Sequence, residues 1–106
     1  MTAVTSASLA IREEMMAHRL VLGEILRRYG ATNVRLFGSV ARGDANEDSD
    51  LDLIVDLDPG GGNALLRVSG IAEALSQLLG RRVDVVTPSL LRDEVSATVL
   101  ADAVAV

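Results

Sequence analysis

The sequence predicts an α+β domain, an α/β arrangement in which a small mixed β-sheet is packed with helices. Three observations predict it. Two long stretches place apolar residues at spacings of three and four, as one face of a helix does, whereas three short apolar stretches have the pattern of strands. These stretches follow one another in the order helix, strand, strand, helix, strand, helix, which suits a sheet covered by helices. The 106 residues suffice for one modest core, so residues 1–106 are expected to form a single domain.

The chain is expected to begin with a flexible tail of small residues at 1–8. An amphipathic helix follows, with its apolar stripe extending from Ile11 to Tyr29, and Gly30 ends it. His18 lies on this stripe, where we interpret it as a partly buried packing residue rather than a ligand.

The centre of the chain is predicted to hold two strands. A short strand over 34–37 leads into a turn at Gly38-Ser39 and one helical turn over 40–43. The second strand covers Asp50 to Leu57, and the glycine-rich segment 59–62 after it is predicted to be a mobile loop.

The last part of the chain is predicted to add two helices and a strand. Apolar spacing indicates a helix from Leu65 to Leu78 that closes at Gly80. A third strand covers Arg82 to Val86, and a last helix is expected to begin at Pro88-Ser89. The apolar end, 101–106, fits no single element.

The composition excludes several kinds of chemistry. The chain has no lysine and no cysteine, so a Walker A loop, a lysyl-adenylate, thiol catalysis and disulfides are all excluded. The net charge of −5 and the presence of only two aromatic residues argue against nucleic acid as a partner. Residues 1–11 are too short and polar for a membrane span or a secretory signal, so no membrane association and a cytoplasmic location are expected.

Three aspartates are candidate metal ligands and catalytic residues. Asp50 and Asp52 are separated by one residue, so a strand places both carboxylates on one face, and Asp84 on the third strand is placed to meet them. Neighbouring carboxylates repel one another unless a cation lies between them, and Mg²⁺ prefers such hard oxygen ligands. Three carboxylates would hold two Mg²⁺ ions about 3.5 to 4 Å apart, with Asp84 also accepting the proton of an attacking hydroxyl.

The Gly38-Ser39 turn is a candidate phosphate site. Glycine allows a phosphate to approach the backbone closely, and serine offers a hydroxyl and an amide at a helix start. Arg42 is placed either to contact a phosphate oxygen or to brace the loop. Most of the seven acidic residues between 44 and 58 are best explained as a solvated surface, and Arg82 as a charge that neutralises the carboxylates.

These residues resemble the minimal nucleotidyltransferase (MNT) branch of the DNA polymerase β-like nucleotidyltransferase superfamily. The shared pattern is a Gly-Ser turn, a spacer of about ten residues, an Asp-x-Asp pair in a strand and a third acidic residue on a later strand. Gly38-Ser39, Asp50-x-Asp52 and Asp84 match it, as do the ARGD segment at 41–44 and the SDLDL segment that begins at Ser49.

The resemblance implies a polymerase β-like core and transfer of a nucleoside monophosphate from ATP or another NTP, with Mg²⁺ and loss of pyrophosphate. It implies nucleotide-binding roles for Gly38, Ser39, Arg42 and Ser49. Chains of this kind are commonly paired with a HEPN-domain ribonuclease toxin, which such antitoxins adenylylate on a tyrosine. Because the chain has no second domain, a partner or a second copy in a homo-oligomer would have to complete the pocket.

Three functions remain open from the sequence. The chain is either a catalyst or an antitoxin that neutralises its partner by binding alone, through apolar faces of the first helix and the C-terminal region. A mean hydropathy of +0.32 agrees with some exposed apolar surface. The third alternative is transfer to a small-molecule hydroxyl, such as that of an aminoglycoside. The nucleotide, the acceptor and the number of groups transferred are left undecided.

Overall fold

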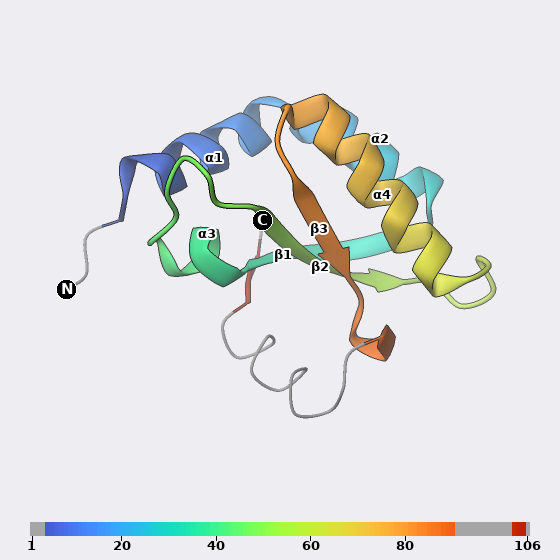
Figure 1. The fold of residues 1–106 in the computed structure, drawn as a ribbon. Helices are drawn as coiled ribbons and strands as arrows, with labels where there is room; N and C mark the ends of the chain where they lie inside the picture. Colours follow the sequence, from blue (N-terminus) through green and yellow to red (C-terminus); the bar gives the residue numbers. More distant parts are fainter. Residues whose placement is uncertain (1–3, 91–102, 106) are drawn as a thin grey trace.

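The computed structural model describes residues 4–90 and 103–105 (Figure 1). The elements in chain order are α1 (Ser6–Ala17), α2 (Arg19–Arg28), β1 (Ala31–Phe37), α3 (Gly38–Arg42), β2 (Leu51–Leu57), α4 (Ala64–Leu79), β3 (Val83–Val86), the 3₁₀ turn η1 (Pro88–Leu90) and β4 (Val104–Ala105). No helix in the described part of the chain is long and apolar enough to cross a membrane.

The four strands form one mixed sheet in the order β3-β2-β1-β4. β1 is antiparallel to both β2 and β4, whereas β2 and β3 are parallel. A parallel pair needs a crossover connection, and α4 supplies it between β2 and β3. The α+β class and the mixed sheet predicted from the sequence are therefore confirmed.

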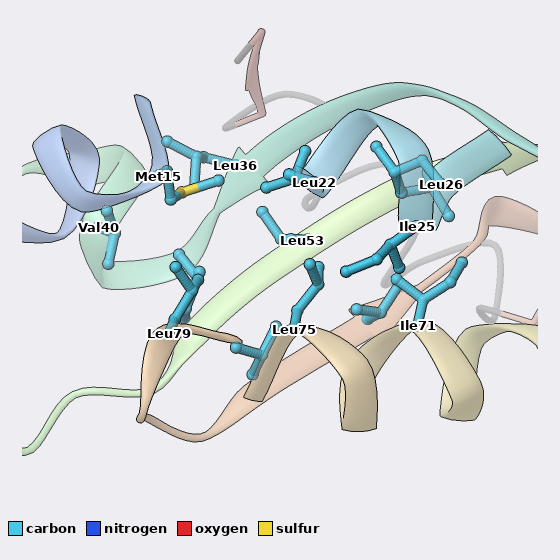
Figure 2. Close-up of a cluster of buried hydrophobic side chains, with 14 of the residues drawn as sticks. Met15, Leu22, Ile25, Leu26, Leu36, Val40, Leu53, Ile71, Leu75 and Leu79 are labelled. Atoms are coloured by element: carbon cyan, nitrogen blue, oxygen red, sulfur yellow. The ribbon is translucent and has the colours of Figure 1, made fainter. Parts of the chain in front are cut away.

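The core lies between the sheet and the helices on one of its faces. α1, α2 and α4 lie on the same side of the sheet in Figure 1. The alternate residues Leu51, Leu53 and Val55 of β2 are fully buried, and Figure 2 shows Leu53 among side chains from the helices and β1. Because side chains alternate along a strand, Asp52 projects from the opposite face of the sheet.

The long helix expected from Ile11 to Tyr29 is in fact two helices. His18 interrupts it with φ −105° and ψ 17°, and its ring Nδ1 donates a hydrogen bond to the carbonyl of Glu14 at 2.9 Å. Both helices bury their apolar residues in the same core, so the apolar stripe continues across the break at His18. For this reason the spacing of apolar residues alone did not reveal the break.

The prediction of a tail at 1–8 is wrong for residues 6–8, because α1 already begins at Ser6. Thr5 is the N-cap of α1, and its hydroxyl accepts a hydrogen bond from the Ser8 amide at 3.1 Å. Ser8 is fully buried. The small polar residues that suggested a tail are therefore a helix cap and a buried first turn.

The strands also differ from the prediction at their ends. β1 begins at Ala31, three residues before the predicted strand, because a bulge with Asn33 at φ 52° interrupts the alternation there. The end of the chain, whose structure the sequence left open, contributes β4 beside β1. The last predicted helix lies mostly at 91–102, outside the described residues, and only η1 is seen where it was expected to begin.

Candidate active site

The three aspartates predicted from the sequence lie close together on the face of the sheet opposite the helices. Asp52 pairs in register with Asp84 on β3 and with Phe37 on β1. Residues paired directly across neighbouring strands project from the same face, so the Asp52 and Asp84 carboxylates lie side by side. Asp50 precedes β2 by one residue and is also linked to this group, through Arg82.

Asp52 is the electrostatic centre of the site. Its pKa is raised from 3.8 to about 6, first by burial and then by the negative charges of Asp84 and Asp50. Arg42 and Arg82 oppose the shift, because a nearby positive charge favours the carboxylate. Every charged residue proposed for the site therefore affects the pKa of Asp52.

Arg82 lies between the other two carboxylates. Its Nε is 3.6 Å from Asp50 Oδ2 and 3.8 Å from Asp84 Oδ1. The Arg82 side chain is 74% exposed, so these ion pairs are weak and easily exchanged for another cation. This arrangement agrees with the interpretation of Arg82 as a charge that neutralises the carboxylates.

Position 38 requires a glycine, both because of its backbone conformation and because Asp52 lies close to it. The φ of Gly38 is +71°, a left-handed conformation that side chains disfavour. A Cβ added at Gly38 would collide with Asp52 Oδ2 and lie 3.2 Å from Asp52 Cγ. The turn from β1 into α3 is thus packed directly on the central carboxylate.

Ser39 and Arg42 both belong to α3, the short helix that this turn begins. The Ser39 carbonyl accepts hydrogen bonds from the amides of Gly43 and Asp44, which close the helix. Arg42 Nε lies 3.3 Å from Asp44 Oδ2, and both side chains are about half exposed, at 53% and 55%. In this structure Arg42 braces the loop after α3, and its positive charge lowers the pKa of Asp52.

Ser49 is held in a turn before β2 rather than beside Gly38. Its hydroxyl accepts a hydrogen bond from the Asn46 amide at 2.9 Å and donates one to Asn46 Oδ1 at 3.3 Å. A nucleotide-binding role for Ser49 stays a prediction.

The carboxylate oxygens of the three aspartates are suitable ligands for a hard divalent cation. Among residues 4–90 and 103–105, no three acidic or histidine side chains converge closely enough to form a ready metal cluster. The carboxylates of Asp50, Asp52 and Asp84 nevertheless have the chemistry that Mg²⁺ prefers, and their mutual repulsion at Asp52 is the kind of strain that a bound cation relieves. The residues present fit such an ion, provided that Arg82 gives way.

Comparison with known proteins identifies the family. Residues 18–106 match the model of the nucleotidyltransferase domain. The chain belongs to this family. Protein adenylyltransferase MntA of Thermococcus cleftensis is 40% identical over 96 residues, which cover 89% of this chain and 90% of the relative. A protein of Methanocaldococcus jannaschii, provisionally named a protein adenylyltransferase, is 32% identical over 77 residues, 73% of this chain and 74% of the relative.

Solved structures agree with this assignment. A protein provisionally named a minimal nucleotidyltransferase superposes with a TM-score of 0.73 at 43% identity, covering 87% of this chain and 92% of that one. A toxin–antitoxin crystal structure with AMP-PNP has a TM-score of 0.61 at 23% identity, covering 77% and 66%, which shows a shared fold. The resemblance to minimal nucleotidyltransferases is confirmed, and the chain is an enzyme that transfers nucleotides.

The sequence did not reveal how α1 contacts the site region of this nucleotidyltransferase. Thr5, Ser8 and Arg12 all hydrogen-bond to α3 or to the residues directly after it. The N-cap pattern of Thr5 and Ser8 could have moved the start of the helix to Ser6. Nothing in the spacing indicates the partners of Arg12, which lie 28 and 29 positions away.

Proposed function

We propose that this nucleotidyltransferase transfers AMP from ATP, with Mg²⁺, to a hydroxyl of a partner protein and acts in this way as an antitoxin. The observation that carries the proposal is the register of Asp52 with Asp84 beside the Gly38 turn. This arrangement joins two carboxylates and a turn where a phosphate can approach the backbone. The curated relatives are named as protein adenylyltransferases, which favours ATP as donor and a protein as acceptor.

In the proposed reaction, the acceptor oxygen attacks the α-phosphorus of ATP. The new bond joins that oxygen to the α-phosphorus, the bond from the α-phosphorus to the oxygen bridging to the β-phosphorus breaks, and pyrophosphate leaves. Asp84 takes the proton of the attacking hydroxyl, and the Gly38-Ser39 turn holds the phosphates close to the backbone. Because the chain supplies no lysine, the developing phosphate charge is met by backbone amides and by Arg42 or Arg82.

Mg²⁺ would be held by Asp50, Asp52 and Asp84. When bound, it would supply positive charge to the triphosphate and to the attacking oxygen, as two-ion sites of this type do. The exposed Arg82, which pairs with Asp50 and Asp84, would have to give way to such an ion.

A HEPN-domain toxin is the partner that we propose, with a tyrosine as the acceptor. The MNT resemblance implies both, and the name MntA is shared by the Thermococcus cleftensis relative and by a solved MntA–HpeT toxin–antitoxin structure. That structure has a TM-score of 0.55 at 17% identity, so it contributes the fold alone.

The proposal is tested by following label from ATP onto a co-expressed toxin encoded beside this chain. ATP labelled at the α-phosphate should label the toxin, and ATP labelled at the γ-phosphate should not, because the β- and γ-phosphates leave together. The label should require MgCl₂ and should be lost with Asp50→Asn. Label from the γ-phosphate, or label that persists in Asp50→Asn, would reject the proposal.

An exposed apolar surface favours the second candidate, an antitoxin that acts by binding alone. Leu9, Met16 and Leu20 of α1 and α2 are 49%, 55% and 75% exposed. The two candidates separate in the Asp50→Asn and Asp52→Asn variants. A variant that still forms the complex but no longer protects cells from the toxin supports catalysis, whereas full protection supports binding alone.

A further inference from the structure

The N-terminal helix is bonded to the connector that follows α3. The connector is defined as residues 43–45. The Thr5 amide donates to the Gly43 carbonyl at 2.8 Å, and the Thr5 hydroxyl donates to the Ala45 carbonyl at 2.6 Å. The Ser8 hydroxyl accepts a hydrogen bond from the Ala45 amide at 3.0 Å. Ser8 and Ala45 are 0% and 1% exposed, so this contact is sealed from solvent.

Arg12 adds a contact to α3 itself. Its Nη2 donates to the carbonyls of Val40 at 2.9 Å and Ala41 at 3.0 Å, in the last turn of the helix. Carbonyl groups at a helix end have no partner within the helix, and a positive side chain there also compensates the negative end of the helix dipole. Arg12 therefore caps α3 from a distant part of the chain.

α3 needs such support because it has only five residues. A helix this short is not stable through its own hydrogen bonds, so its position depends on what holds it. It is fixed at its start by the packing of Gly38 on Asp52, and at its end by the contacts from α1. A shift of α3 would move the Gly38-Ser39 turn relative to the central carboxylate.

We propose that Thr5, Ser8 and Arg12 are positioning residues for nucleotide binding, acting through α3. The inference rests on the proposed docking of phosphates at Gly38-Ser39. It adds a segment that the family match does not include, because that match begins at residue 18. The three side chains hold the far end of α3 in place and so keep its first residues against Asp52.

The test measures affinity for α,β-methylene-ATP with MgCl₂ by calorimetry, because this analogue cannot lose pyrophosphate. Arg12→Gln is compared with Arg12→Lys, which keeps the positive charge and a side chain long enough to reach the two carbonyls. Arg19→Gln is the matched control, since Arg19 is an exposed arginine that donates to a backbone carbonyl within its own helix pair. All measurements are made at a temperature where circular dichroism shows each variant folded.

We expect Arg12→Gln to weaken binding about tenfold, as misplacement of a binding group does. Arg12→Lys should recover most of the loss, and Arg19→Gln should bind like the wild type. A purely structural role would lower the melting temperature and leave the affinity of the folded protein unchanged, so a folded Arg12→Gln with wild-type affinity overturns the inference. If Arg12→Gln does not fold, Thr5→Val is judged by the same criterion.

The failures of the two proposals are distinguishable. If the wild type does not bind the analogue either alone or in complex with its co-expressed partner, the proposed function is rejected and the inference falls with it. If the wild type binds and Gly38→Ala does not, but the Arg12 and Thr5 variants bind normally, only the positioning role is rejected.

Discussion

At the scale of single residues, Gly38 links the fold to the chemistry. Replacement by alanine places a side chain in a left-handed backbone conformation and against Asp52. We expect Gly38→Ala to cost about 1 to 3 kcal/mol of stability and to abolish nucleotide transfer in the folded protein, because the turn must move. Urea denaturation and the transfer assay measure the two effects.

Gly60→Ala is the matched control for this substitution. Gly60 also has a positive φ, +79°, but no atom lies within 4 Å of an added Cβ. Gly60→Ala should therefore cause a similar backbone strain but leave nucleotide transfer intact. Equal losses of transfer in both variants would show that the contact between Gly38 and Asp52 is not what matters.

The raised pKa of Asp52 predicts that the stability of the protein depends on pH. This pKa is raised from 3.8 to about 6, so within this window the native state binds more protons than the unfolded state. The free energy of unfolding contributed by Asp52 therefore falls as the pH rises from about 4 to about 6. Asp52→Asn should remove this fall and be more stable at neutral pH by on the order of 1 kcal/mol, allowing for solvent screening.

The measurement is urea denaturation of both proteins across this pH range without divalent cations. The difference in stability between variant and wild type should grow with pH and then level off. Asp56→Asn, on the same strand and face, should keep the wild-type slope because Asp52 still titrates in it. A difference that is constant with pH would contradict the shifted pKa.

At the scale of elements, Arg67 joins three parts of the fold. Its guanidinium donates to the carbonyls of Tyr29 at 2.8 Å, Gly30 at 3.0 Å and Asp58 at 3.0 Å, and the residue is 8% exposed. It thereby connects α4 to the end of α2 and to the residue after β2.

Replacement of Arg67 by methionine removes the Arg67 donor from these three carbonyls, although the Gly30 carbonyl keeps the Asp58 amide as a donor at 2.8 Å. We expect a loss of about 2 to 4 kcal/mol in the free energy of unfolding, measured by urea denaturation. Arg28→Met, at an exposed position, should change stability by less than about 0.5 kcal/mol. Similar losses in both variants would show that the Arg67 hydrogen bonds do not stabilise the packing of these elements.

The sequence predicted the elements whose signals are local. Alternation and spacing were enough for β2, β3 and α4, and the Gly38-Ser39 and Asp50-x-Asp52 patterns indicated the candidate site, because each depends on neighbours in the chain. Asp84 was expected only to lie on a strand near Asp50 and Asp52, and the parallel pairing of β2 with β3 brings it into register with Asp52.

Features that depend on contacts distant in the chain were missed. The break at His18 preserves the apolar stripe, the pairing of β4 with β1 depends on residues nearly seventy positions apart, and Arg12 finds its carbonyls only after α3 has packed. Tertiary contacts decide such features, and local patterns do not encode them.

At the scale of the whole molecule, one face of the sheet packs against the helices and the other carries the candidate site. The helices bury Leu51 and Leu53, while Asp52 between them faces away. The face that carries Asp52 is where we propose that nucleotide and acceptor meet, with the partner protein completing the pocket.

The most direct test of this account is pyrophosphate release from ATP in the presence of MgCl₂ and the co-expressed partner. Asp50→Asn, Asp52→Asn and Asp84→Asn should each lower the rate about 100-fold or more, because each removes a carboxylate from the site. Asp56→Asn, on the same face of β2, should keep nearly the wild-type rate. Release that survives in Asp84→Asn but is lost in Asp56→Asn would contradict the account.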